Sequence, residues 1–185
     1  MGDRARVAVR FFVRVDINEK TMDRKATPFD VYNSYDEKEW ERSGYYPQSG
    51  GFFVTSRARI EAAFVSKQAM AVFLKEQTMC HRYASYGFQL EHLYEEPGTS
   101  SPDVEVKRHG SLVMVEGKLG DLKRLSSTNN IYKEGKEAIF KKGADIVMFE
   151  FTNRFPGIKR ELQRLADKHI HGYYYYTDED KYYSF

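Results

Sequence analysis

Two short carboxylate–lysine triplets lie close together in the second half of the sequence. They are Glu116-Gly117-Lys118 and Asp121-Leu122-Lys123, and both follow Pro102-Asp103. Side chains two residues apart on a strand point to the same face of a sheet, so each triplet can aim a carboxylate and an ammonium group at one place. Together with Asp103 this makes an oxygen-lined site suited to Mg²⁺ or Mn²⁺. A lysine beside it can orient water and offset developing negative charge, as phosphodiester hydrolysis requires. Such triplets are also common on charged surfaces, so an ordinary solvated strand is the alternative.

A further carboxylate, Glu76, lies on the apolar side of a predicted helix. Val72 and Phe73 stand four and three residues before it, and Cys80 stands four residues after it. These spacings place all four side chains on one helix face. A carboxylate on a buried face needs a charged partner, a metal ion or a raised pKa. The alternative is that Glu76 lies at the edge of the helix and extends into solvent, and the pattern alone leaves both open.

Hydrophobic periodicity predicts the elements that must position these residues. Alternation and apolar runs indicate strands at 4–16, 51–55, 88–93, 103–106, 111–115, 144–151 and 171–176, and helical spacing with capping signals indicates helices at 60–86, 131–142 and from Pro156 onward. Residues 17–50 carry few aliphatic side chains, which indicates an irregular segment. The order of elements from residue 60 predicts an α/β sandwich around a mixed sheet. We therefore divide the chain into an N-terminal extension, residues 1–58, and an α/β domain, residues 59–185.

This order of elements and motif residues resembles the PD-(D/E)XK nuclease superfamily. It comprises a helix with an inward Glu76, a strand, Pro102-Asp103, a hairpin, a carboxylate-x-lysine triplet, a helix and a strand, and it covers residues 60–176. The resemblance implies a restriction-endonuclease-like αβββαβ core and a nuclease domain at 59–185. It implies that Glu76, Asp103 and Asp121 hold one or two Mg²⁺ or Mn²⁺ ions and that Lys123 positions the attacking water.

Within that superfamily the sequence resembles most the small nuclease domains at the C-termini of bacterial contact-dependent inhibition and other polymorphic toxins, several of which cleave tRNA. The stretches that carry this resemblance are 50–55, 75–77, 86–88, 101–104, 121–124, 129–131 and 143–147. The resemblance implies a nucleic-acid substrate, either RNA such as tRNA or DNA. It also implies an immunity or inhibitor protein as a partner.

The two triplets fit this pattern differently. Glu116 follows Asp103 by 13 residues, which suits a single hairpin, whereas Asp121 follows it by 18 residues. Glu116 and the glycine after it also form a natural two-residue turn, which would place Glu116 and Lys118 at a hairpin tip in solvent. Lys123 precedes a short polar loop and a helix, as the catalytic lysine does in the toxin domains. We favour Asp121 and Lys123 as the catalytic pair and keep Glu116 and Lys118 as the alternative.

Charge, composition and the absence of certain motifs exclude several classes of protein. The 185 residues include 29 basic and 27 acidic side chains, so a net charge of +2 excludes a polycation that binds nucleic acid by its total charge. A local basic patch is sufficient for binding, and Lys107, Arg108 and Arg124 are candidates to contact phosphates. P-loop, dinucleotide-binding and serine-hydrolase motifs are absent, and the histidines lack the spacing of a zinc site. The single cysteine excludes a disulfide framework.

The remaining features bear on location and on other functions. No apolar run approaches the roughly 18–20 residues that span a membrane, and Arg10, Arg14 and Asp16 interrupt the apolar stretch near the N-terminus. We therefore expect a cytoplasmic protein without a signal peptide. The run Tyr173-Tyr174-Tyr175-Tyr176 fits an edge strand that buries alternate rings, or a surface that stacks on bases. The alternative function is a catalytically inactive module on the same fold that binds nucleic acid or protein, such as an accessory protein of a phage or mobile element.

Overall fold

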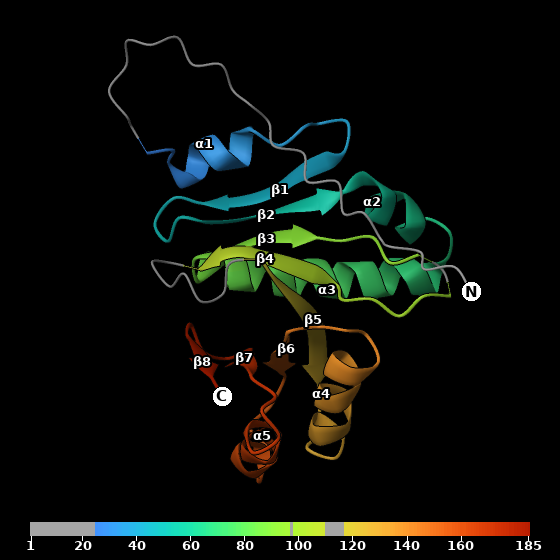
Figure 1. The fold of residues 1–185 in the computed structure, drawn as a ribbon, viewed down its shortest axis with the longest axis vertical. Helices are drawn as coiled ribbons and strands as arrows, with labels where there is room; N and C mark the ends of the chain where they lie inside the picture. Colours follow the sequence, from blue (N-terminus) through green and yellow to red (C-terminus); the bar gives the residue numbers. More distant parts are fainter. Residues whose placement is uncertain (1–24, 97, 110–116) are drawn as a thin grey trace, which may run out of the picture.

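One mixed sheet runs through the protein. The computed structural model describes residues 25–96, 98–109 and 117–185, and in it eight strands follow one another across the sheet in chain order (Figure 1). They are β1 (Trp40–Tyr46), β2 (Gly51–Ser56), β3 (Phe88–His92), β4 (Val104–His109), β5 (Lys118–Leu125), β6 (Ile146–Phe151), β7 (Gly172–Tyr176) and β8 (Tyr182–Ser184). Strands β2 and β3, β5 and β6, and β6 and β7 pair in parallel, and the other neighbours pair antiparallel. This confirms the predicted α/β fold with a central mixed sheet.

Helices cover both faces of the sheet. The helices are α1 (Pro28–Asn33), α2 (Arg57–Ala63), α3 (Lys67–Ser85), α4 (Ile131–Phe140) and α5 (Ile158–Ala166). Successive side chains of a strand point to opposite faces, and β6 shows which helices lie on each face. Met148 belongs to the core that includes α3, whereas Val147 and Phe149 belong to the core that includes α4 and α5. Burial on both sides explains why β6 is a continuous apolar run broken only by Glu150.

The predicted helix over residues 60–86 is wrong as a single element, because residues 64–66 separate α2 from α3. The Ser66 hydroxyl accepts a hydrogen bond from the backbone N–H of Ala69 at 3.0 Å, which caps the start of α3. Phe64 and Val65 in the break are 75% and 83% exposed, so they add apolar residues to the pattern without entering the core. The predicted end is correct, since Gly87 follows with a positive φ of 99°.

Part of the segment predicted to be irregular is regular structure. Thr27 and Asp30 form a capping box that starts α1, and residues 40–46 form β1, which pairs with β2. Gly51 is required in β2, because a Cβ there would lie 1.9 Å from the carbonyl oxygen of Ala84 in α3. The strands predicted at 4–16 and 111–115 lie outside the described residues.

The tyrosine run forms β7 and is packed in the protein. Tyr175 lies in the core beneath α3, and Tyr174 and Tyr176 lie in the opposite core. Strand β8, which the sequence did not predict, pairs with β7, so β7 has a neighbour on both sides. None of the helices within the described residues is long and apolar enough to cross a membrane.

Candidate active site

The hydrogen bonds between β4 and β5 bring Asp103 and Asp121 together. Val104 pairs with Gly120, and the backbone N–H of Asp103 donates to the carbonyl oxygen of Gly120 at 3.1 Å. The N–H of Leu122 donates to Oδ2 of Asp103 at 2.7 Å, which fixes the Asp103 carboxylate against the backbone next to Asp121. The structure therefore places these two predicted site residues side by side.

Two ammonium groups balance this carboxylate pair. Lys142 Nζ lies 2.7 Å from Oδ1 of Asp121 and 3.2 Å from Oδ1 of Asp103. Lys123 Nζ lies 3.1 Å from Oδ2 of Asp121 and 3.4 Å from Oε2 of Glu134 in α4. The Asp121 side chain is completely buried and Asp103 is 8% exposed. Charges this deep require partners, and both lysines supply them.

Burial and the neighbouring Asp121 charge change the protonation of Asp103. Burial, and then the charge of Asp121, raise the pKa of Asp103 to about 8, although Lys142 opposes this shift. Burial alone would lower the pKa of Lys123 and of Lys142, but the neighbouring carboxylates outweigh it and raise both. The lysines therefore remain charged at neutral pH, and the Asp103–Asp121 pair is a position that favours a cation.

Glu76 is buried and has protein partners. Its Oε2 atom accepts a hydrogen bond from Nη2 of Arg59 at 2.6 Å and lies 3.0 Å from Nε2 of His92. The Gln77 amide lies 2.8 Å from the other ring nitrogen of His92, which orients the imidazole. Burial alone would raise the pKa of Glu76, but His92 and Arg59 outweigh it and the pKa is lowered. Of the two alternatives left open by the sequence, the buried carboxylate with a charged partner is correct.

One cavity of about 330 Å³ connects these groups. Its charged lining includes Glu76, Asp103, Lys123, Arg124, Glu134 and Lys142. Helix α3 contributes Glu76 and α4 contributes Glu134, so the cavity lies between the helices of opposite faces, where β4 and β5 present the Asp pair. The predicted residues Glu76, Asp103 and Lys123 thus share one cavity, with Asp121 buried behind Lys123 and Lys142.

The alternative triplet lies elsewhere on the strand. Lys118 is the first residue of β5 and pairs with Val106. It is five residues from Lys123, or roughly 17 Å along an extended strand. Glu116 lies outside the described residues.

The predicted phosphate contacts differ in their surroundings. Lys107 pairs with Glu105 at 3.0 Å and with Glu91 at 3.5 Å, away from the Asp pair along β4. Arg108 is exposed on the same strand. Arg124 lines the cavity and forms an ion pair with the buried Glu150. Arg124 is therefore the predicted phosphate contact that the structure places at the cavity.

The carboxylates of Asp103 and Asp121 are suited to hold one magnesium ion. Within the described ranges, no three His, Cys, Asp or Glu side chains form a group that could hold a metal ion. Mg²⁺ commonly binds proteins through only one or two carboxylates and keeps several waters. Asp103 and Asp121 meet this requirement, since one ammonium group, that of Lys142, already contacts both.

Comparisons with known proteins give a distant structural similarity. No protein-family model and no curated protein matches the chain. Among solved structures, the chain is similar to a chain of the CdiA-CT/CdiI toxin and immunity complex from Burkholderia pseudomallei. The identity is 12%, the TM-score is 0.45, and the match covers 65% of this chain and 88% of that chain.

Proposed function

We propose that the protein is a metal-dependent nuclease of the PD-(D/E)XK type that hydrolyses phosphodiester bonds in nucleic acid. The observation that supports this most strongly is the buried Asp103–Asp121 pair, which faces a common cation position beside Lys123. A structural role alone gives little reason to bury two carboxylates against each other, because their mutual repulsion destabilises the fold. A site that binds a cation and a phosphate accounts for both the pair and the lysines.

Each side chain has a distinct role in this proposal. Asp103 and Asp121 would hold Mg²⁺ or Mn²⁺, which when bound supplies Lewis-acid stabilisation of negative charge on the phosphate. Lys123, held by Asp121 and Glu134 and 20% exposed, orients the attacking water and donates to a phosphate oxygen. Lys142 balances the charge of the Asp pair, and its ammonium group would be available to a phosphate if a divalent cation were held by that pair.

A second candidate function is supported by the same ion pairs. Arg59 and His92 engage Glu76, and Lys142 engages Asp103 and Asp121, so the described protein groups balance these carboxylates without a metal ion. An inactive module that keeps the scaffold and binds nucleic acid or protein fits this arrangement. The toxin role and an immunity partner remain predictions from the sequence resemblance.

The test is a cleavage assay of the full chain with labelled tRNA, single-stranded RNA and plasmid DNA in Mg²⁺. We expect Asp103→Asn and Lys123→Met to lower cleavage by about 100-fold or more, as loss of one transition-state contact does in other enzymes. Lys118→Met is the matched control and should cleave as the wild type does. Thermal melting verifies that each variant is folded.

The outcomes separate the candidates. If both site variants cleave as fast as the wild type, the site assignment is wrong. If the wild type cleaves none of the substrates and calorimetry detects no binding of millimolar Mg²⁺, the inactive module replaces the nuclease.

A further inference from the structure

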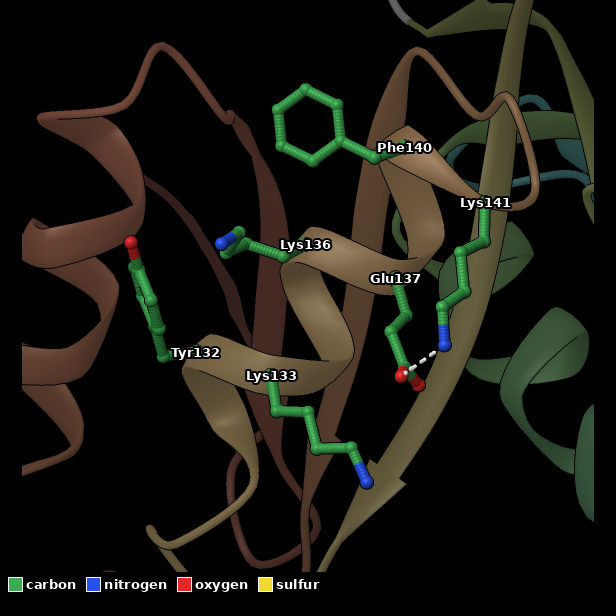
Figure 2. Close-up of a pocket in the computed structure, with 6 residues that line it drawn as sticks. All are labelled: Tyr132, Lys133, Lys136, Glu137, Phe140 and Lys141. Atoms are coloured by element: carbon green, nitrogen blue, oxygen red, sulfur yellow. Dashed lines mark hydrogen bonds and ion pairs between the residues drawn. The ribbon is translucent and has the colours of Figure 1, made fainter.

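Part of helix α4 lies outside the core. Ile131, Gly135 and Ala138 of this helix are buried against the core. Residues four apart lie on the same side of a helix, so two neighbouring rows remain on the outside. One row is Tyr132, Lys136 and Phe140, and the other is Lys133, Glu137 and Lys141 (Figure 2). We call these six residues the α4 outer face.

The α4 outer face is hollowed and partly apolar. Its six residues line a cavity of about 390 Å³. The Phe140 ring is 69% exposed and projects freely at the end of the helix in Figure 2. The Tyr132 ring lies under Lys136, with Nζ 5.5 Å from the ring centroid, and under Arg164, with Cζ 4.3 Å from it. Tyr132 is half-buried, so the exposed Phe140 ring is the one that offers a stacking surface for another flat ring.

The charge of the α4 outer face favours an anionic ligand. It carries Lys133, Lys136 and Lys141 against one carboxylate, Glu137. Arg164 of α5 lies next to it, paired with Glu161 at 2.7 Å. Lys141 Nζ is already 2.6 Å from Oε1 of Glu137. Lys133 and Lys136 form no ion pair with a carboxylate of the described residues, and Lys136 Nζ lies over the Tyr132 ring. Cations next to one exposed ring suit the phosphates and base of a nucleotide.

The α4 outer face borders the candidate active site, because residues next to it in the sequence line that cavity. Lys133 is followed by Glu134, which lines the catalytic cavity, and Lys141 is followed by Lys142, which contacts Asp103. A polynucleotide is much longer than one catalytic cavity, so the nucleotides that flank the reacting phosphate must lie on the adjacent surface. The α4 outer face is an adjacent surface with positive charge.

We propose that the α4 outer face binds an unpaired nucleotide of the substrate, with its base stacked on Phe140 and the neighbouring phosphates held by Lys133 and Lys136. The choice of nucleic acid as the ligand rests on the proposed nuclease function. Stacking on Phe140 requires a base whose own face is open, so the proposal names single-stranded or looped nucleic acid as the substrate class rather than continuous duplex.

The test measures binding of a fluorescein-labelled single-stranded RNA oligonucleotide to the full chain by anisotropy in EDTA, where metal-dependent cleavage cannot occur. We expect Phe140→Ala to weaken binding about tenfold, because stacking on an aromatic side chain contributes this order of affinity per base. Phe140→Tyr keeps the ring and should retain binding.

Lys133→Glu and Lys136→Glu should each weaken binding and reduce the slope of log affinity against log salt by about 0.7 or more. Lys38→Glu, an exposed lysine next to β1 at the far edge of the sheet, is the matched control and should leave binding unchanged.

Each result decides between the two proposals. If the wild type cleaves RNA but the Phe140 and lysine variants bind it as tightly as the wild type does, the α4 outer face does not bind the nucleotide, and the proposed nuclease function is unaffected. If those variants weaken binding but no cleavage occurs in Mg²⁺, the α4 outer face does bind the nucleotide and the proposed nuclease function is wrong. Duplex RNA bound as tightly as the single strand, with no effect of Phe140→Ala, overturns the stacking role. If poly-glutamate binds and the oligonucleotide does not, nucleic acid is the wrong ligand, and the α4 outer face instead binds an acidic protein partner.

Discussion

Lys142 Nζ lies 2.7 Å from Oδ1 of Asp121, a carboxylate that is completely buried. The same ammonium group lies 3.2 Å from Oδ1 of Asp103, so one side chain balances both members of the carboxylate pair. Lys142 lies just beyond the end of α4, directly before Gly143. Because it occupies the point that both carboxylates face, a divalent cation that bound this pair would have to compete with it.

Replacing Lys142 with methionine should expose this competition. In EDTA at pH 8.5, we expect Lys142→Met to lower the free energy of unfolding by about 3 kcal/mol, because removing one partner leaves buried carboxylate charge uncompensated. Mg²⁺ should restore more stability to the variant than to the wild type and bind it more tightly. Urea unfolding with and without Mg²⁺, together with calorimetry, measures both effects.

The neighbouring lysine provides the control for this change. Lys141 forms an exposed pair with Glu137, which contributes little to stability, so Lys141→Met should change the unfolding free energy by less than about 0.5 kcal/mol. Equal Mg²⁺ affinity in Lys142→Met and the wild type would show that Lys142 does not occupy the cation position.

The sequence predicted the part of the site that depends on local pattern. The two-residue spacing of Asp121 and Lys123 predicted that both lie on one side of a strand, and the apolar face of the predicted helix made a buried Glu76 one of two alternatives. The structure brings these residues to one place because β4 pairs with β5, with Val104 opposite Gly120. A short meander of neighbouring strands is readable from the sequence, since its turns and strands are contiguous.

The partners of these carboxylates were not predicted, because they come from distant positions without a motif. Lys142 is 39 residues from Asp103, and Arg59 is 17 residues from Glu76. His92 ends a strand, and nothing in its spacing indicates that it contacts Glu76. The break between α2 and α3 was also missed, because the apolar residues at 64 and 65 continue the helical pattern although they are exposed. Tertiary packing decides both features.

The raised pKa of Asp103 predicts how stability depends on pH. Burial and the charge of Asp121 raise this pKa to about 8 in the folded protein, whereas an unfolded aspartate titrates near about 3.9. Between these values the folded protein binds more protons than the unfolded chain, so the free energy of unfolding falls as the pH rises. The slope from this group is at most about 1.4 kcal/mol per pH unit, and it disappears above pH 8 and below pH 4.

Asp103→Asn should remove this slope. The amide cannot ionise, so in EDTA we expect the variant to lose less stability than the wild type between pH 5 and pH 8 and to be the more stable of the two at pH 8. Urea unfolding at each pH gives the comparison. The same pH dependence in both proteins would mean that Asp103 is ionised throughout this range.

Replacing Glu76 tests whether this carboxylate supports metal binding or only stabilises the fold. His92 and Arg59 lower its pKa despite its burial, so it is ionised at neutral pH and places a negative charge on the cavity that Asp103 and Lys123 line. We expect Glu76→Gln to weaken Mg²⁺ binding about tenfold, the order of effect seen when groups that support a metal site are removed.

The control is Glu61→Gln, which removes an exposed carboxylate of α2 and should leave Mg²⁺ affinity unchanged. Calorimetry and urea unfolding are measured together, because Glu76→Gln also weakens the bonds to Arg59 and His92. Lower stability with unchanged Mg²⁺ affinity would assign Glu76 to the fold alone and leave Asp103 and Asp121 as the metal-binding pair.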